Sequence, residues 1–393
     1  MEVKLSMKKN ILPSKAITKH LIVISIDALN SKDYQTIIKL PNFKKLLEQG
    51  SHAKEVIGVY PSLTYPSHTS IITGTYPNKH GIYANEICQP GVKLQKWNWY
   101  SSAVKVPTLY DIAKKSNMKV GAIFWPVMAG TKINYNLPEI WIIDKSKSQI
   151  LLSLMSGTPL VILDLFLRYR KILEGTKHPN LDNFSTAAAT HLIKKYKPNL
   201  FLLHLTQLDH ARHKHGVMST NALDALKSED SRIGQVIQAT KDAGIYEDTT
   251  FIVLGDHGFS DVSYKICLNV AFRKSGLVDV DADGKVTDWK AYANYTDGSC
   301  QIVLKNKNDV NVKNKVKAII NSFIADKTYG IKKIYSKDAV RIEKKVSGDF
   351  EFMLEAKDGY YFANDWTLKD VVNKIDPSNF DEYNEDYYVA THG

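Results

Sequence analysis

Short, almost uninterrupted apolar runs recur along the chain and alternate with segments of helical periodicity. The runs cover residues 21–26, 120–124, 200–205 and 250–255, and each has the length of a strand. Because strands covered on both faces are apolar throughout, these runs predict a central, mostly parallel sheet. The stretches between them predict helices that cover it, so the expected fold class is α/β, with a central, mostly parallel sheet flanked by helices.

Proline and glycine mark the ends of the predicted helices. One helix is expected to begin at Pro41 and to end at Gly50, and another to open at Pro107. A longer helix is expected to stop near Gly244. These positions follow from the tolerance for proline in a first helical turn and for glycine just past a last one.

The character of the sequence changes from about residue 263. Short strand-like pieces, many lysines and aromatics and one helical stretch replace the regular alternation. With 393 residues, 44% of them hydrophobic, the chain is long enough for one large domain with an insertion. We therefore expect a catalytic α/β core at 18–262, a smaller α+β cap or insertion at 263–386, and a return to the core at 387–393.

Acidic and histidine side chains follow three of the four apolar runs. Asp27 follows the first run, Asp209 follows the third with His213 four residues later, and Asp256 and His257 follow the fourth. Ligands of open α/β sheets bind beyond the carboxyl ends of strands. One such aspartate is commonly a turn or capping residue, but three together indicate a site. Carboxylates and imidazoles without thiolates suit Zn²⁺ or Mn²⁺, which predicts two divalent metal ions.

The segment at 60–85, YPSLTYPSHTSIITGTYPNKHGIYAN, supplies a candidate nucleophile. Pro66 is expected in the first turn of a helix, which puts Thr64 or Tyr65 at the helix N-terminus. A hydroxyl group there meets backbone N–H groups and the positive end of the helix dipole, which attract phosphate. The alternative is that Thr64 only caps the helix.

This segment resembles the nucleophile region of the nucleotide pyrophosphatase/phosphodiesterase branch of the alkaline phosphatase superfamily. SIDAL, LDHARHKHG, LGDHGFSD and ATHG resemble the metal-binding motifs of that family, in the same order. The resemblance covers residues 20–392 and is least in the expected cap. It implies an alkaline phosphatase-like fold and hydrolysis of phosphoric ester or anhydride bonds through a phospho-threonine intermediate, with Zn²⁺ as the first expectation.

The resemblance also implies a role for each motif residue. Thr64 would attack phosphorus, Asn85 would contact a phosphoryl oxygen, and a second displacement would release the phosphoryl group. Tyr65, beside the nucleophile, is expected to contact a nucleotide base or a leaving group. One metal ion would be held by Asp209, His213 and His392, and the other by Asp27, Thr64, Asp256 and His257.

Two of the metal ligands carry an open question. His210 and His215 are chemical alternatives to His213, which is preferred because of its four-residue step from Asp209. His392 is the penultimate residue of this sequence, and chain ends fray readily. This ligand is therefore expected to be the least securely held.

Charge and cysteine content narrow the class of partner. Lysine and arginine exceed aspartate and glutamate by 52 to 41, which favours an anionic substrate or surface without choosing between them. The resemblance implies that this partner is a small anionic phosphoester, possibly a nucleotide. The chain has no basic run with interleaved aromatics and no zinc-finger spacing, so specific nucleic-acid binding is not expected. Three cysteines without a CxxC pair suggest neither a disulfide framework nor a thiolate zinc site.

The first twenty residues carry lysines but no apolar run of signal-peptide length, so a cytoplasmic protein without a transmembrane segment is expected. The oligomeric state is left open. The absence of a CxPxR segment argues against sulfate esters. A phosphomonoesterase or phosphonate hydrolase of the same superfamily remains the main alternative function, and a non-catalytic phosphate-binding protein is the next.

Overall fold

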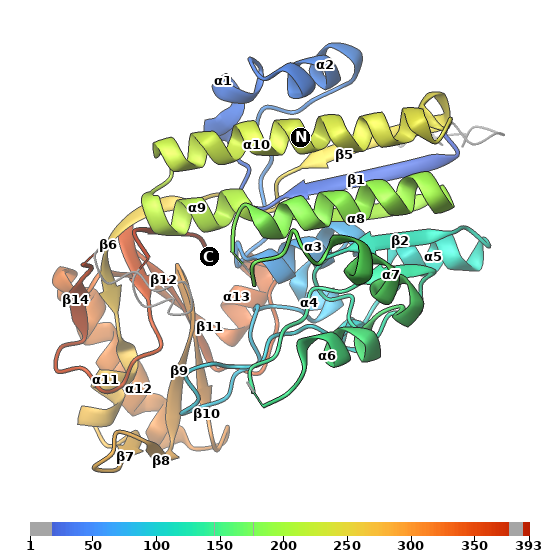
Figure 1. Cartoon of the computed structure of the whole chain (residues 1–393). Helices are drawn as coiled ribbons and strands as arrows, with labels where there is room; N and C mark the ends of the chain where they lie inside the picture. The colour runs from blue at the N-terminus through green and yellow to red at the C-terminus, as the bar shows by residue number, and fades with distance from the viewer. Residues whose placement is uncertain (1–17, 145, 176, 377–387) are drawn as a thin grey trace, which may run out of the picture.

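The computed structural model describes residues 18–144, 146–175, 177–376 and 388–393. Its centre is a sheet in the order β3-β2-β4-β1-β5, in which every neighbouring pair is parallel (Figure 1). This sheet confirms the expected fold class, and the four apolar runs all become strands. The short β3 was not expected, because three residues carry little periodic signal. The strands are β1 (His20–Ile26), β2 (Val120–Ile123), β3 (Tyr135–Leu137), β4 (Leu200–Leu205) and β5 (Thr249–Leu254).

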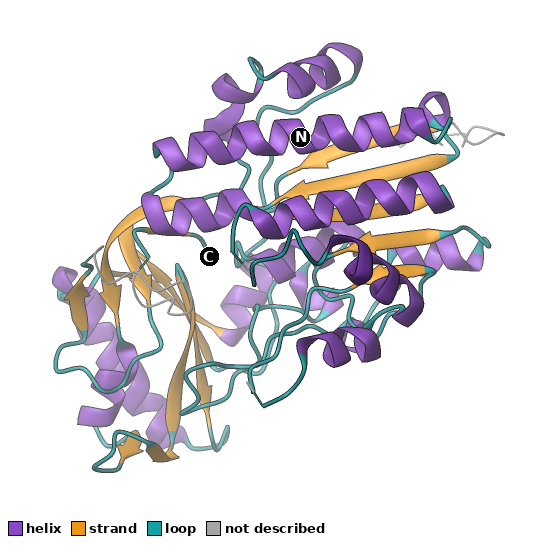
Figure 2. Cartoon of the chain, viewed as in Figure 1, coloured by secondary structure: helices purple, strands orange, loops and turns teal. Residues whose placement is uncertain are grey.

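Helices cover both faces of this sheet (Figure 2). Because side chains alternate along a strand, Ile22 and Ile24 of β1 pack with α7, α8 and α10, whereas Val23 packs with α3 and α5. All three side chains are at most 4% exposed. The helices flanking the sheet are α1 (Tyr34–Ile37), α2 (Pro41–Gln49), α3 (Thr64–Thr73), α4 (Pro77–His80), α5 (Leu109–Lys115), α6 (Gln149–Ser156), α7 (Pro159–Tyr169), α8 (Asn180–Tyr196), α9 (Gln207–His215) and α10 (Thr220–Asp242).

The predicted helix ends are close to those observed, with one instructive shift. The helix expected to open at Pro107 begins at Leu109, because Thr108 caps it. The Thr108 side chain accepts a hydrogen bond from the N–H of Asp111, and the Asp111 carboxylate accepts one from the N–H of Thr108 at 3.0 Å. This reciprocal capping box satisfies two helix-end donors and sets the first turn.

The C-terminal region forms separate sheets with their own hydrophobic core, drawn from residues 262 to 375. One sheet is antiparallel and has the order β11-β12-β10-β9. Another is mixed, because β6 pairs in parallel with β13 and antiparallel with β14 and β15. Of its helices only α12 was expected, because α11 and α13 are two turns long. The domain boundaries stay a prediction, and 377–386 lie outside the described residues. The elements are β6 (Ser260–Ile266), α11 (Leu268–Lys274), β7 (Val278–Val280), β8 (Val286–Trp289), β9 (Ala291–Thr296), β10 (Ser299–Leu304), α12 (Val310–Ala325), β11 (Ile331–Ser336), α13 (Lys337–Glu343), β12 (Phe352–Ala356), β13 (Gly359–Phe362), β14 (Val372–Lys374) and β15 (Ala390–Thr391).

The last described residues lie between β6 and α9. Strand β15 pairs with Ser260 and Asp261 of β6, and the N–H of Val389 donates to the carbonyl of His213 at 3.0 Å. The C-terminus lies near α9 (Figure 1). Within the described part of the chain, no helix combines the length and the apolarity that a membrane crossing requires.

Candidate active site

The carboxyl ends of the three adjacent strands β4, β1 and β5 carry the candidate ligands. Asp27 follows β1 directly, Asp209 lies in the first turn of α9 behind β4, and Asp256 and His257 follow β5. Gly255 lets the last of these turns approach β1, because a Cβ atom there would lie 1.8 Å from the carbonyl oxygen of Leu29. The predicted strand-end residues therefore meet at one edge of the sheet.

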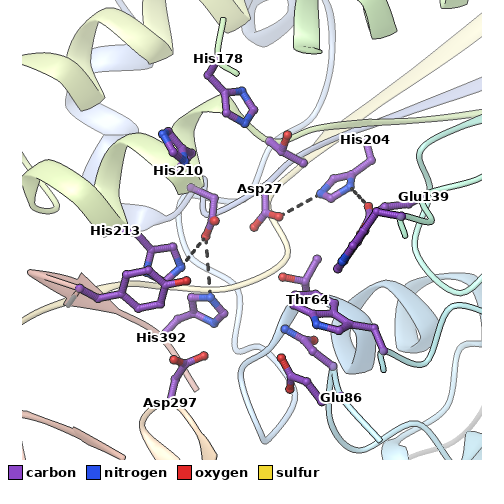
Figure 3. A pocket seen from close by; sticks show the side chains of 16 residues that line it. Asp27, Thr64, Glu86, Glu139, His178, His204, His210, His213, Asp297 and His392 are labelled. Atoms are coloured by element: carbon purple, nitrogen blue, oxygen red, sulfur yellow. Dashed lines mark hydrogen bonds and ion pairs between the residues drawn. The ribbon is translucent and has the colours of Figure 1, made fainter. Parts of the chain in front are cut away.

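Asp209, His213 and His392 form the first group, with one ligand atom of each within 4.8 Å of the others. The Nε2 atoms of His213 and His392 lie 3.5 and 3.7 Å from Asp209 Oδ1 (Figure 3). Each Nδ1 atom lies 2.9 Å from a backbone carbonyl oxygen, that of Ala390 for His213 and that of Ser62 for His392. These carbonyls accept the Nδ1 protons and so direct the Nε2 lone pairs at the site.

The chain end at His392 is held firmly, contrary to the fraying expected from its position. Its side chain is 4% exposed, and its carbonyl accepts a hydrogen bond from the N–H of Gly298 at 2.9 Å. Its ring stacks on His257, with centroids 3.7 Å apart. Of the three histidines of α9, the structure groups His213 with Asp209 and His392. His210 packs on His178 and also lines the cavity, and His215 is exposed at the helix end.

The second group consists of Asp27, Asp209 and His257. His257 Nε2 lies 3.0 Å from Asp27 Oδ1 and 3.3 Å from Asp256 Oδ2. Asp209 was expected to serve one group only, and the structure places it in both. Asp256 lies beside this group, where its Oδ1 accepts a hydrogen bond from the N–H of Ala28 at 3.0 Å.

The two ligand groups together form a cage of carboxylates and imidazoles whose charges suit divalent cations. Burial and the neighbouring Asp27 raise the pKa of Asp256 to about 6, and the same two causes hold the pKa of Asp209 well above its ordinary value. The buried atoms Asp209 Oδ1 and Asp256 Oδ2 accept no hydrogen bond from the described residues. Burial keeps the pKa of His213 down at about 3, so this imidazole is neutral and able to bind a metal ion. Burial lowers the pKa of His257, but Asp256 and Asp27 raise it more, to about 10, so a positive charge already offsets these carboxylates in the second group. Carboxylates under mutual repulsion that attract positive charge, with the neutral imidazole of His213 beside them, suit cations.

Thr64 is the first residue of α3, which begins two residues before Pro66. Its Oγ1 atom lies 3.3 Å from His257 Nε2, and the residue is 8% exposed. The Asn85 Oδ1 atom accepts a hydrogen bond from the N–H of Tyr65 at 2.9 Å. Because Oδ1 is engaged in this way, the donating Nδ2 of Asn85 is the group left for a ligand in the cavity that Asn85 and Thr64 both line.

Tyr65 does not line this cavity. Its side chain is 0% exposed, and its hydroxyl donates to Glu139 Oε1 at 2.9 Å. The ring meets that of Trp97 edge to face, with centroids 5.2 Å apart. The expected contact between Tyr65 and a base or leaving group therefore has no geometric support, and Trp97 occupies the cavity wall instead.

Sequence reasoning missed a hydrogen-bonded chain behind Asp27. His204 of β4 lies with Nε2 3.1 Å from Asp27 Oδ2 and Nδ1 3.0 Å from Glu139 Oε2 (Figure 3). Burial lowers the pKa of His204, but its hydrogen bonds to Asp27 and Glu139 raise it more, so the ring is held protonated between two carboxylates. The available signal was this single polar residue within the apolar run LFLLHL.

His68 was missed as well. Its Nδ1 atom lies 2.8 Å from the carbonyl oxygen of Thr64 and 3.5 Å from Asp256 Oδ2. The ring is fully buried and meets His204 at a centroid distance of 4.4 Å. It therefore ties the first turn of α3 to the strand ends and helps to place the Thr64 hydroxyl against the cage.

A cavity of about 290 Å³ opens between these groups and a wall from the loops (Figure 3). In this view His213 and His392 lie to the left of Thr64, Glu139 lies above it to the right, and Glu86 lies below it. Among the described residues that line the cavity there is no lysine and no arginine. The basic excess of the chain is thus spread over other surfaces and is absent from this site.

A parallel sheet that gathers two groups of carboxylates and imidazoles around a helix-borne threonine defines the class as an α/β protein with a candidate metal site at its strand ends. The family model described as type I phosphodiesterase / nucleotide pyrophosphatase matches residues 21–393. The chain therefore belongs to this family, as its motifs had indicated.

Two curated relatives illustrate the likeness. Ectonucleotide pyrophosphatase/phosphodiesterase family member 1 of Rattus norvegicus is 26% identical over 251 residues, which are 62% of this chain and 24% of that protein. Venom phosphodiesterase CdcPDE of Crotalus durissus collilineatus is 27% identical over 251 residues, 62% of this chain and 26% of that protein. The matched region thus spans about a quarter of the length of these relatives.

Solved structures share the fold over almost the whole chain. Murine ectonucleotide pyrophosphatase/phosphodiesterase 5 has a TM-score of 0.62 at 18% identity, covering 95% of this chain and 84% of that one. An inactive variant of the same murine protein in complex with AMP has the same TM-score and coverages at 17% identity. At 95% coverage of this chain, the shared fold includes the C-terminal sheets as well as the central sheet.

Proposed function

We propose that this chain is a metal-dependent phosphodiesterase or nucleotide pyrophosphatase that works through a covalent phospho-threonine. The observation that carries the proposal is the position of Thr64 Oγ1 at the start of α3, 3.3 Å from His257 and beside two ligand groups that share Asp209. A hydroxyl group at a helix N-terminus meets backbone donors that also attract phosphate. Membership of the family supports the same reading.

The residues divide the reaction among them. Thr64 Oγ1 forms a bond to phosphorus while the ester or anhydride P–O bond to the leaving group breaks, which leaves the phosphoryl group on Thr64. Asn85 Nδ2 donates to a non-bridging oxygen, and the N-terminus of α3 favours its negative charge. Water then attacks phosphorus, the bond between phosphorus and Thr64 Oγ1 breaks, and Thr64 Oγ1 takes up a proton as the phosphate product leaves.

Asp209, His213 and His392 would hold one divalent ion, and Asp27, His257 and Asp256 would hold the other next to Thr64. When bound, such a pair lowers the pKa of attacking hydroxyl groups and neutralises charge on attacking and leaving oxygens. We propose Zn²⁺ as the ion, with Mn²⁺ as the alternative, because the donors are carboxylates and imidazoles without thiolates.

The substrate class proposed from the family is a small phosphoester, with nucleotides as the first candidates. A murine relative of the same fold has been solved with AMP. A phosphomonoesterase or phosphonate hydrolase remains the alternative, because the same cage suits both reactions and only the wall of the cavity distinguishes them. The cytoplasmic location expected above remains a proposal of its own.

The test compares p-nitrophenyl phosphate with a p-nitrophenyl nucleotide diester, in Zn²⁺ and in Mn²⁺. We expect a preference for the diester, and a loss of more than about 10³-fold in kcat for Thr64→Ala, because the attacking atom is removed. Thr73→Ala, at the other end of the same helix, is the matched control. A preference for the monoester would favour the phosphomonoesterase alternative. Unchanged activity in Thr64→Ala would exclude Thr64 as the nucleophile.

A further inference from the structure

The turn that follows Asp27 contains a strained, fully buried residue. Ala28 has a φ of 68°, in the left-handed region that disfavours residues with a Cβ atom, and it is 0% exposed. Such a conformation persists only where the surrounding structure imposes it, and it occurs most often at functional sites. The hydrogen bonds of the Ala28 peptide groups identify the residues that impose it.

Both polar backbone groups of Ala28 are engaged. Its N–H donates to Asp256 Oδ1 at 3.0 Å. Its carbonyl oxygen accepts from Nη1 of Arg212 and, at 2.9 Å, from Nδ2 of Asn30. Asn30 belongs to the same turn, whereas Arg212 lies on α9, three residues after Asp209. The peptide group next to Asp27 is thus bonded to the helix that carries a ligand of both groups.

The guanidinium group of Arg212 has two further partners. Its Nη2 donates to Asp33 Oδ1, and its Nε donates to the carbonyl of Val217 at 3.2 Å. Arg212 and Asp33 are both 0% exposed. A buried pair of charges contributes little net stability, because its desolvation offsets its attraction. The planar guanidinium fork nevertheless fixes the relative positions of its partners more closely than one hydrogen bond can.

Asp33 holds the other end of the same turn. Its Oδ2 accepts from the N–H of Asn30 at 2.9 Å, in the capping box of the short 3-10 helix Ser31–Asp33. The turn is therefore closed on itself by Asp33 and closed against α9 by Arg212. Asp27, which begins this turn, consequently keeps a fixed spacing from the ligands on α9.

We propose that Arg212 is a positioning residue that sets the spacing of the two ligand groups by fastening the turn after Asp27 to α9. Asp27 belongs to one group, His213 to the other, and Asp209 to both. Arg212 does not line the cavity, and it acts through the turn and not on the substrate. The inference rests on the proposed function, because it takes the two groups as sites for metal ions.

The first test neutralises both charges, so that neither is left buried alone. In the double variant Arg212→Met/Asp33→Asn, an amide oxygen at position 33 can still accept from the N–H of Asn30. Urea denaturation should show a folded protein, because the charged pair contributes little net stability. The Kd for Zn²⁺, measured on the metal-free full chain by competition with a chelating dye, should rise by about 10- to 100-fold, as is typical for residues that orient metal ligands.

Amide hydrogen exchange tests the fastening itself, without any metal. In the metal-free double variant, exchange in the peptide that covers residues 27–33 should be faster than in the wild type by about tenfold or more, because the turn opens locally. Exchange in β4 should stay unchanged. A residue that only stabilised the fold would instead alter exchange in β4 together with that in the turn, and would leave the Kd for Zn²⁺ as it was.

Arg273→Met is the matched control, because Arg273 also donates to two backbone carbonyls, those of Thr367 and Leu368, in the C-terminal region. It should change neither the Kd nor the exchange at residues 27–33. If the double variant does not fold, Arg212→Lys replaces it, since this change keeps a charge beside Asp33 and removes the planar fork. The same rise in Kd and the same local exchange are then expected.

An unchanged Kd for Zn²⁺ in the folded variant would overturn the inference and leave the proposed function standing. If the wild type bound neither Zn²⁺ nor Mn²⁺, the proposed function would fail, and the exchange experiment would decide the inference. Equal exchange at residues 27–33 in variant and wild type would then overturn it.

Discussion

The two sides of the cavity are built by different means. On the ligand side, Asp27, Asp209 and His257 come from the ends of adjacent parallel strands, whose register fixes their spacing. On the wall side, Trp97 and Glu139 come from connecting segments outside the sheet. In the proposed function, the first side would place the charge that acts on phosphorus, and the second would face the group that the phosphorus carries. Under that proposal, reaction type and substrate choice are encoded in separate parts of the chain.

The largest effect should follow from removing the one residue that both ligand groups share. In Asp209→Asn, a neutral amide replaces the carboxylate whose Oδ1 lies 3.5 Å from His213 and 3.7 Å from His392. We expect kcat to fall by more than about 10³-fold, because several kcal/mol of charge stabilisation depend on the bound ions. Bound metal should fall from two equivalents toward none, measured by elemental analysis of dialysed protein.

Asp224→Asn is the matched control for that change, since Asp224 is an exposed carboxylate on α10 that pairs with Lys227. It should keep both the metal content and the activity. If Asp209→Asn retained one full equivalent of metal, Asp209 would serve a single ion, as the sequence had suggested, and the sharing seen in the structure would be of no consequence for binding.

This contrast also explains what the sequence could predict. The residues at strand ends were identified because an apolar run followed by a polar residue is a local pattern, and the topology of a parallel sheet gathers such residues. Asp209 was assigned to one ion only, because the overlap of two groups depends on distances in space. His392 is held in place because β15 pairs with β6, a strand that lies about 130 residues earlier in the chain.

The wall was beyond prediction for a related reason. Its residues lie in segments without hydrophobic periodicity, namely Trp97, Glu139 and Trp141. In such segments the sequence does not distinguish a side chain that faces a cavity from one that packs in the core. Tyr65 was misjudged in this way, because adjacency to Thr64 in sequence does not determine which side of α3 a ring occupies. His204 carried a weak signal, since a buried polar residue within an apolar strand needs a partner.

An intermediate effect should follow from loosening Asp27 without removing it. His204→Gln breaks the contacts of 3.1 Å to Asp27 and 3.0 Å to Glu139 that hold this ligand in place. Residues that orient a metal ligand typically contribute 10- to 100-fold in affinity, so we expect the Kd for Zn²⁺ to rise by about that factor. Competition with a chelating dye measures it directly, apart from any activity.

His191→Gln is a fair control, because His191 makes a similar contact of 3.1 Å to Asp164 far from the cage. At saturating Zn²⁺ the His204→Gln variant should regain most of its kcat, since the ligands themselves are intact. A variant with unchanged Zn²⁺ affinity and a lasting loss of kcat would instead place His204 in direct contact with the reacting groups.

The smallest effect should come from Tyr65→Phe. Tyr65 links the two sides of the cavity through a single hydrogen bond to Glu139, and the substitution removes that bond. Burial and the nearby Glu139 carboxylate raise the pKa of Tyr65 well above its ordinary value, so the hydroxyl stays protonated and donates to Glu139. Its loss should lower the free energy of unfolding by about 1 kcal/mol, measured by urea denaturation. The ring remains in place against Trp97, so KM for a nucleotide diester should change by less than about twofold.

The control is Tyr83→Phe, which removes a hydroxyl that accepts from the N–H of Asp349 at 3.1 Å, away from the cavity. The two variants should lose similar stability, whereas only Tyr65→Phe leaves a carboxylate oxygen of Glu139 without its donor. A large rise in KM with stability unchanged would mean that Tyr65 meets the substrate after all. The wall would then begin at the residue next to the nucleophile, and the division between a side that acts on phosphorus and a side that selects its substituent would no longer hold.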